Sequence, residues 1–113
     1  MNEKRDAERL PILGALQAEI MVFQPILINE ISRIGVTVET HFPMQIDSLH
    51  DLRLTLGIKS IVLKARVAHS HIRDVDQINV VYHTGLEFVS PSTHATAVIV
   101  EFVDALRAER SGA

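Results

Sequence analysis

Short segments in which every second residue is apolar restrict the fold of this chain more than any other feature. From Leu52 to Leu56 leucine occupies every second position, and Ile61–Val67 continues in the same way after Gly57. A period of two places the apolar side chains on one face of a β-strand, whereas an amphipathic helix needs spacings of three and four. The pattern therefore predicts a mainly β protein in which each strand has one buried face.

Six such strands are predicted along the chain. Pro25 and Phe42-Pro43 are expected to interrupt strands, because proline cannot donate a ladder hydrogen bond and restricts the residue before it. Gly57 is expected in a turn or bulge, and the polar Arg73-Asp74-Val75-Asp76 in a hairpin loop. The predicted strands are Leu16–Val22, Ile26–Ile31, Val36–Thr40, Asp51–Ile58, Ile61–Val67 and Ile78–Val89.

The last segment changes to helical spacing. Ser90-Pro91-Ser92 resembles a helix start, and apolar residues recur at helical intervals up to Arg110, which predicts a helix over about 92–110. Val98 and Phe102 are expected to pack on the strands and to cover the open end of a barrel, in preference to contacting a second copy. Residues 10–113 are thus predicted to form one small antiparallel barrel or sandwich with a helix packed against it.

Composition excludes several classes of protein. The chain has 113 residues, which suits a single domain, and no cysteine, so disulfides, a thiol nucleophile and cysteine-ligated metals are excluded. There is no apolar run near the ~20 residues that span a bilayer and no signal-peptide pattern, so we expect a soluble, cytoplasmic domain without membrane insertion. A net charge of −3 with both signs interspersed argues against binding a nucleic-acid polymer, but not against a small anion held by a few arginines.

The sequence contains no pattern typical of catalysis. It lacks a glycine-rich phosphate loop, a Gly-x-Ser-x-Gly elbow and a His-Glu-x-x-His motif, and its carboxylates are scattered, so no enzyme is predicted. His69 and His71 would share a strand face and could bind a divalent metal if His83 lay opposite. The favoured interpretation is that they are half-exposed residues near a hairpin end. No metal and no cofactor are therefore expected.

Two short motifs are candidates for ligand binding. Residues 1–9 are polar and are predicted to form a mobile arm, within which Arg5 and Arg9 stand four residues apart. Guanidinium groups can hold a phosphate or a guanine edge with two hydrogen bonds and can stack on a base. The second motif, Glu30-Ile31-Ser32-Arg33-Ile34-Gly35, falls at the turn between two predicted strands. There a carboxylate can accept hydrogen bonds from guanine, Ser32 can donate one, and Gly35 allows close approach to the backbone.

Together the two motifs resemble those of the PilZ family of bacterial cyclic di-GMP receptors, which have RxxxR followed by [D/N]xSxxG. Gly85-Leu86-Glu87-Phe88 is similar to the Gly-x-x-Phe of that family's last strand, and the terminal helix falls where the family has one. The resemblance covers about residues 5–108. It implies a six-stranded antiparallel barrel with a C-terminal helix, and an arginine arm that closes over cyclic di-GMP.

Carried over to this chain, the resemblance implies that Arg5 and Arg9 clamp phosphates and guanine faces while Glu30, Ser32 and Gly35 contact a guanine. Ordering of the arm would then alter the interaction with an unidentified protein partner, in signalling that controls motility, exopolysaccharide or biofilm. The chain departs from the family at Glu30, where Asp or Asn is usual. The alternative is therefore a PilZ-like adaptor that binds a protein partner and no nucleotide.

Overall fold

The computed structural model describes residues 7–20, 24–75 and 78–112, which form seven β-strands and a C-terminal helix. The predicted arm falls largely outside these residues, so its boundary at residue 9 stays a prediction. The strands are β1 (Leu10–Pro11), β2 (Gln17–Ile20), β3 (Gln24–Ile31), β4 (Gly35–Thr40), β5 (Leu49–Leu56), β6 (Lys59–Val75) and β7 (Val80–Val89), and the helix is α2 (Thr93–Gly112).

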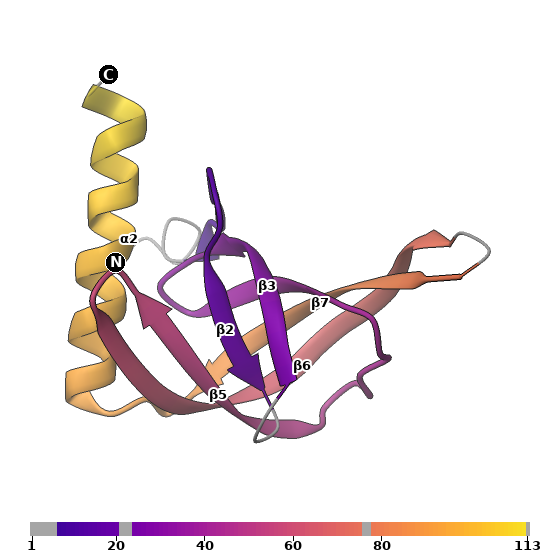
Figure 1. The fold of residues 1–113 in the computed structure, drawn as a ribbon. Helices are drawn as coiled ribbons and strands as arrows, with labels where there is room; N and C mark the ends of the chain where they lie inside the picture. Colours follow the sequence, from indigo (N-terminus) through magenta and orange to yellow (C-terminus); the bar gives the residue numbers. More distant parts are fainter. Residues whose placement is uncertain (1–6, 21–23, 76–77, 113) are drawn as a thin grey trace.

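Six of the strands close into a barrel (Figure 1). Neighbours follow the order β3-β2-β5-β6-β7-β4, and β4 pairs back onto β3 to close the ring. Every pairing is antiparallel, and the two-residue β1 adds to β3 outside the ring. The predicted six-stranded antiparallel barrel with a C-terminal helix is therefore confirmed.

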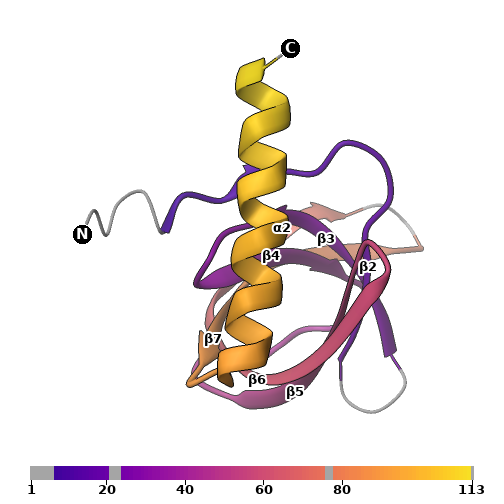
Figure 2. The same ribbon diagram turned by 90° about the vertical axis from the view of Figure 1, so that its left-hand side faces the viewer.

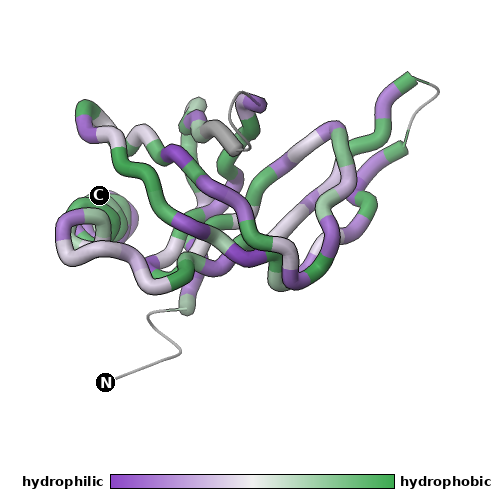
Figure 3. The backbone as a smooth tube through the Cα atoms, turned by 90° about the horizontal axis from the view of Figure 1, so that it is seen from below, coloured by the Kyte–Doolittle hydropathy of each residue, from purple (hydrophilic) through white to green (hydrophobic). Residues whose placement is uncertain are grey.

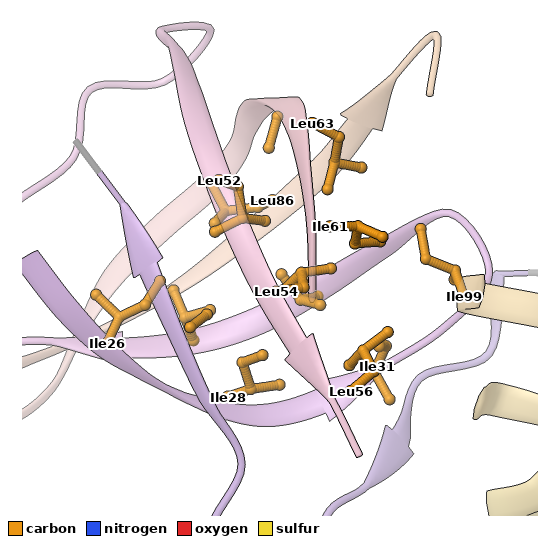
Figure 4. Close-up of a cluster of buried hydrophobic side chains, with 14 of the residues drawn as sticks. Ile26, Ile28, Ile31, Leu52, Leu54, Leu56, Ile61, Leu63, Leu86 and Ile99 are labelled. Atoms are coloured by element: carbon orange, nitrogen blue, oxygen red, sulfur yellow. The ribbon is translucent and has the colours of Figure 1, made fainter. Parts of the chain in front are cut away.

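The alternating apolar residues form the interior of this barrel. Leu52, Leu54 and Leu56 of β5 are buried, as are four alternate residues of β6 from Ile61 to Val67. Figure 4 shows these side chains converging with others from β3, β7 and α2. Along the strands hydrophilic and hydrophobic residues alternate (Figure 3), because one face packs inward and the other faces solvent.

Helix α2 starts at a capped N-terminus and stands against one end of the barrel (Figure 2). The hydroxyl oxygen of Ser92 accepts a hydrogen bond from the backbone N–H of Ala95 at 3.0 Å, which satisfies a donor of the first turn. Val98 is buried in the core and Phe102 packs against it, as predicted. No helix within the described ranges is long and apolar enough to cross a membrane.

Two predicted interruptions are wrong. Arg73–Val75 belongs to β6 and not to a loop, because the β6–β7 hairpin extends beyond the barrel, as Figure 1 shows, where the strands have little core to cover and tolerate polar residues. Pro25 lies within β3. It is exposed and near the start of the strand, opposite Glu19 of β2, a position where proline is tolerated.

Candidate functional site

Three strands present a continuous outer surface next to the second motif. Because Val36 and Val38 of β4 point into the core, the residues between them and beside them point outward. We call this surface the β4–β7–β6 face. Its outward residues pair across the three strands in the rows Gly35–Glu87–Arg66, Thr37–Gly85–His69 and Glu39–His83–His71.

Arg9 lies at the edge of this face, directly before β1. Its Nη2 is 2.9 Å from the point where a Cβ on Gly35 would stand, so the guanidinium covers the bare backbone of that glycine. Its Nε is buried and has no hydrogen-bond partner among the described residues. Burial lowers the pKa of Arg9, while the carboxylates of Glu30 and Glu87 act in the opposite direction. The arrangement therefore holds a half-buried guanidinium between two acidic side chains.

Ser32 shapes the turn that carries the second motif. Its side chain is fully buried, and its Oγ accepts hydrogen bonds from the backbone N–H groups of Ile34 and Gly35, both at 3.2 Å. The hydroxyl also lies 3.3 Å from the carbonyl oxygen of Gly35, to which it donates. In this structure the serine thus serves the turn itself and sets where Gly35 enters β4.

Gly35 is required by close packing. A Cβ there would overlap the carbonyl oxygen of Leu86 on the neighbouring strand β7, in addition to meeting the guanidinium of Arg9. Because the carbonyl oxygen of Leu86 is part of the backbone of a paired strand, it cannot rotate away as a side chain could. The close approach predicted at this glycine is therefore made, in the described structure, by Leu86 and Arg9.

Of the five predicted ligand-binding residues, the structure brings Arg9, Glu30 and Gly35 together and places Ser32 beneath them in the turn. Arg5 lies outside the described residues. Glu87 and His69 also lie close to this group, and neither motif includes them. Gly85 and Glu87 occupy adjacent outward positions of the last strand. Once the strand order is known, this spacing places Glu87 opposite Gly35 and His69 opposite Gly85.

The three histidines that were considered as metal ligands lie on the same face. The ring of His69 stacks near that of His71 with 6.3 Å between centroids, and His71 meets His83 edge-on at 5.4 Å. Burial lowers the pKa of His83, with further contributions in the same direction from His71 and Arg73. In the part of the chain that the structure describes, no group of three or more histidine or acidic side chains is placed to hold a metal ion.

His69 covers a second bare glycine. The three atoms nearest to a Cβ built on Gly85 all belong to its imidazole ring. Gly35 and Gly85 lie on adjacent strands, one residue pair apart in the outward rows. The guanidinium of Arg9 and the ring of His69 therefore cover two neighbouring glycines. A pocket of about 650 Å³ lies away from this face, beside β2 and Gly57. The candidate site is thus an open surface with planar groups on it.

Comparison with known proteins places the fold but not the family. No protein-family profile and no curated protein sequence matches the chain. Two solved structures of MrkH from K. pneumonia are similar in fold. One shows a TM-score of 0.79 at 16% identity over 94% of this chain, and the other, in its apo state, 0.76 at 17% over 98%. The chain spans about half the length of these MrkH chains (50% and 55%), and the likeness supports a PilZ-like fold.

Proposed function

We propose that this chain is a cyclic di-GMP receptor module in bacterial second-messenger signalling. In this proposal Arg5 and Arg9 bind phosphates and guanine faces, Glu30 accepts hydrogen bonds from a guanine, and Gly35 gives access to the backbone. Ser32 acts through the turn that it stabilises. The PilZ-like fold supports the proposal, and so does the position of Arg9 beside Gly35 of the second motif.

The observation that carries the proposal is the guanidinium of Arg9 above Gly35. The side chain is half-buried, yet its Nε has no hydrogen-bond partner among the described residues, which is an unfavourable state for a charged donor. A guanidinium can bind a phosphate or the acceptor edge of guanine with two hydrogen bonds, and such a ligand would supply the missing partner when Arg9 turns its Nε outward on binding. An anionic ligand with purine edges therefore fits this position.

Binding would be transmitted by ordering of the arm. Glu8 precedes Arg9 and lies 3.6 Å from Arg107 of α2, so the arm and the helix already meet. A ligand that draws the arm over the β4–β7–β6 face would change this contact and the surface offered to a protein partner. We propose that the module acts in this way in the cytoplasm, without catalysis, on motility, exopolysaccharide or biofilm output.

A second candidate is the adaptor that binds a protein and no nucleotide. The two carboxylates near Arg9 favour it, because Glu30 and Glu87 already offset part of the charge that an anion would meet. Glu30 is also one methylene longer than the Asp or Asn of the resembling family. Under this reading Arg9 is a structural cation that joins β1 to β4.

Calorimetric titration of cyclic di-GMP separates the two candidates. Arg9→Ala is compared with the wild type and with Arg110→Ala, which removes one exposed arginine from the last turn of α2. The receptor predicts saturable binding that weakens at least roughly tenfold in Arg9→Ala and is unchanged in Arg110→Ala. Equal affinity in all three proteins contradicts the role of Arg9. If the wild type does not bind cyclic di-GMP, the receptor is rejected and the adaptor is the remaining candidate.

A further inference from the structure

The β4–β7–β6 face carries three imidazoles that the two motifs do not include. His69 and His71 are exposed and His83 is partly buried, and their rings form a continuous row from β6 to β7. The row begins with His69 over Gly85, which is one residue pair from Gly35, the glycine that Arg9 covers. Any flat ligand that lies on Arg9 and extends across β7 would meet these rings.

Imidazoles are the planar groups available for stacking at this place. The chain has no Trp. Among the described residues, Phe42, Phe88 and Phe102 pack against the core, and Tyr82, the neighbour of His83 in β7, points to the opposite face of the strand. The ring of His69 rests with one side on Gly85 while the residue remains exposed. Nucleotide-binding surfaces commonly use an aromatic or imidazole ring as a base-stacking platform. The bare glycine below the ring allows it to lie close to the sheet.

Fixed charges on the face nearly cancel. Among the described residues, three arginines lie on or beside it, and each is near a glutamate: Arg66 is 3.6 Å from Glu87, Arg73 is paired with Glu39, and Arg9 lies near Glu30 and Glu87. A ligand with two phosphates therefore gains little net attraction from these groups. The histidines are the side chains on this face that can add positive charge within the physiological pH range.

We propose that His69, His71 and His83 extend the ligand surface of Arg9 and make binding of the cyclic dinucleotide proton-linked, with tighter binding at lower pH. This inference rests on the proposed function. His69 stacks on a guanine, and the row of imidazoles takes up protons as the phosphates approach. The ligand keeps both phosphate charges throughout, so the change in affinity arises in the protein.

The sign follows from the groups that face the row. His83 is opposite Glu39 of β4, near Glu30 of β3, and beside His71 and Arg73 of β6. In the free protein, burial and the neighbouring positive groups hold the pKa of His83 down. A bound dianion raises the pKa of His83 from this lowered value, so the complex binds more protons than the free protein. By linkage, the affinity then increases as the pH falls.

The test is calorimetric titration of cyclic di-GMP at pH 8, 7 and 6 at constant ionic strength. It uses the wild type, the triple variant His69→Gln/His71→Gln/His83→Gln, and His94→Gln, an exposed histidine of α2. At each pH, two buffers of different ionisation enthalpy report the protons taken up. We expect the wild type and His94→Gln to bind roughly fivefold tighter at pH 6 than at pH 8, with proton uptake, and the triple variant to lose this dependence.

Each other outcome overturns the inference in a distinguishable way. In the first case, the wild type binds in a way that depends on Arg9, but its affinity is constant from pH 8 to 6 and no protons are taken up. This result rejects the role of the histidines and leaves the proposed receptor function intact. A pH dependence that persists in the triple variant assigns the protons to other groups. An absence of binding at every pH overturns the inference together with the proposed function. Because proton uptake is measured in the wild type, the test does not depend on folding of the variant.

Discussion

Arg33 donates a hydrogen bond from its Nη2 to Oδ1 of Asp104 at 2.7 Å, and so joins the turn of the second motif to α2. Arg107, three residues further along the helix, lies 4.0 Å from the same carboxylate and 3.6 Å from Glu8. The four charged side chains connect the residue before Arg9 with the residue after Ser32. Both motifs are thereby attached to one stretch of the helix.

The Arg33–Asp104 pair is expected to contribute little to global stability. Their side chains are 33% and 51% exposed, so solvent screens the charges. A double-mutant cycle with Arg33→Ala and Asp104→Ala, measured by urea unfolding, should give a coupling free energy below about 1 kcal/mol that decreases with salt. A coupling well above this value that is insensitive to salt would contradict a screened surface pair.

Gly35→Ala should destabilise the protein much more than Gly85→Ala. At Gly35 the new methyl group meets the backbone carbonyl of Leu86, so β4 and β7 must separate, at a cost of about 1–3 kcal/mol. At Gly85 it meets the exposed ring of His69, which can rotate away. Thermal unfolding of the two variants compares them directly. Equal losses would show that His69 cannot leave its place.

The displaced ring gives Gly85→Ala a second readout. If His69 stacks on the ligand, this substitution should weaken cyclic di-GMP binding while the melting temperature changes little. His69→Ala, which removes the ring without adding a methyl group to the sheet, is the matched control and should weaken binding to a similar extent. Normal binding by Gly85→Ala would argue against the stacking role.

Stability should fall on mild acidification. Burial lowers the pKa values of His50 and His83 below the usual 6.5, so the unfolded chain binds these protons at a higher pH than the folded protein does. The free energy of unfolding therefore decreases as the pH drops through about 6.5. Urea midpoints at pH 7.5, 6.5 and 5.5 measure this. The slope should be smaller in His50→Gln/His83→Gln, and unchanged in His94→Gln.

Loss of the helix cap should cost about 1 kcal/mol. Ser92→Ala removes the acceptor for the N–H of Ala95 at the start of α2. Because α2 packs on the barrel through buried residues such as Ile99, the loss should appear in the global unfolding transition. Ser60→Ala, at an exposed site in β6, serves as the control. An unchanged midpoint for Ser92→Ala would mean that the first turn contributes nothing to folding.

Local patterns predicted the barrel well, since a strand with one buried face alternates visibly, as β5 does around Leu54. They failed at the β6–β7 hairpin, because beyond the barrel both strand faces are exposed and Arg73 carries no signal that separates strand from loop. They also failed at Pro25. A strand can include a proline where no ladder hydrogen bond is needed from that residue, and this depends on the pairing in the folded sheet.

The candidate site was predictable in part. Arg9, Glu30 and Gly35 were predicted to share a site because they belong to motifs with fixed spacing, and the structure places them together; that they bind a ligand stays a prediction. The sequence could not show that His69 lies beside them, since that depends on the pairing of β6 with β7 and on the register shift after Val67. Nor did it reveal that the hydroxyl of Ser32 is engaged within its own turn.

Leu10 has a consequence for the residue that precedes it. The side chain of Leu10 is 1% exposed. As part of the short strand β1, Leu10 pairs with Ile31 of β3. The backbone next to Arg9 is therefore held by the core, and the conformational entropy of that backbone is lost during folding, before any ligand arrives. Arg9 is in this sense a preorganised group, whose contacts with a ligand contribute to affinity without a further ordering penalty for its backbone.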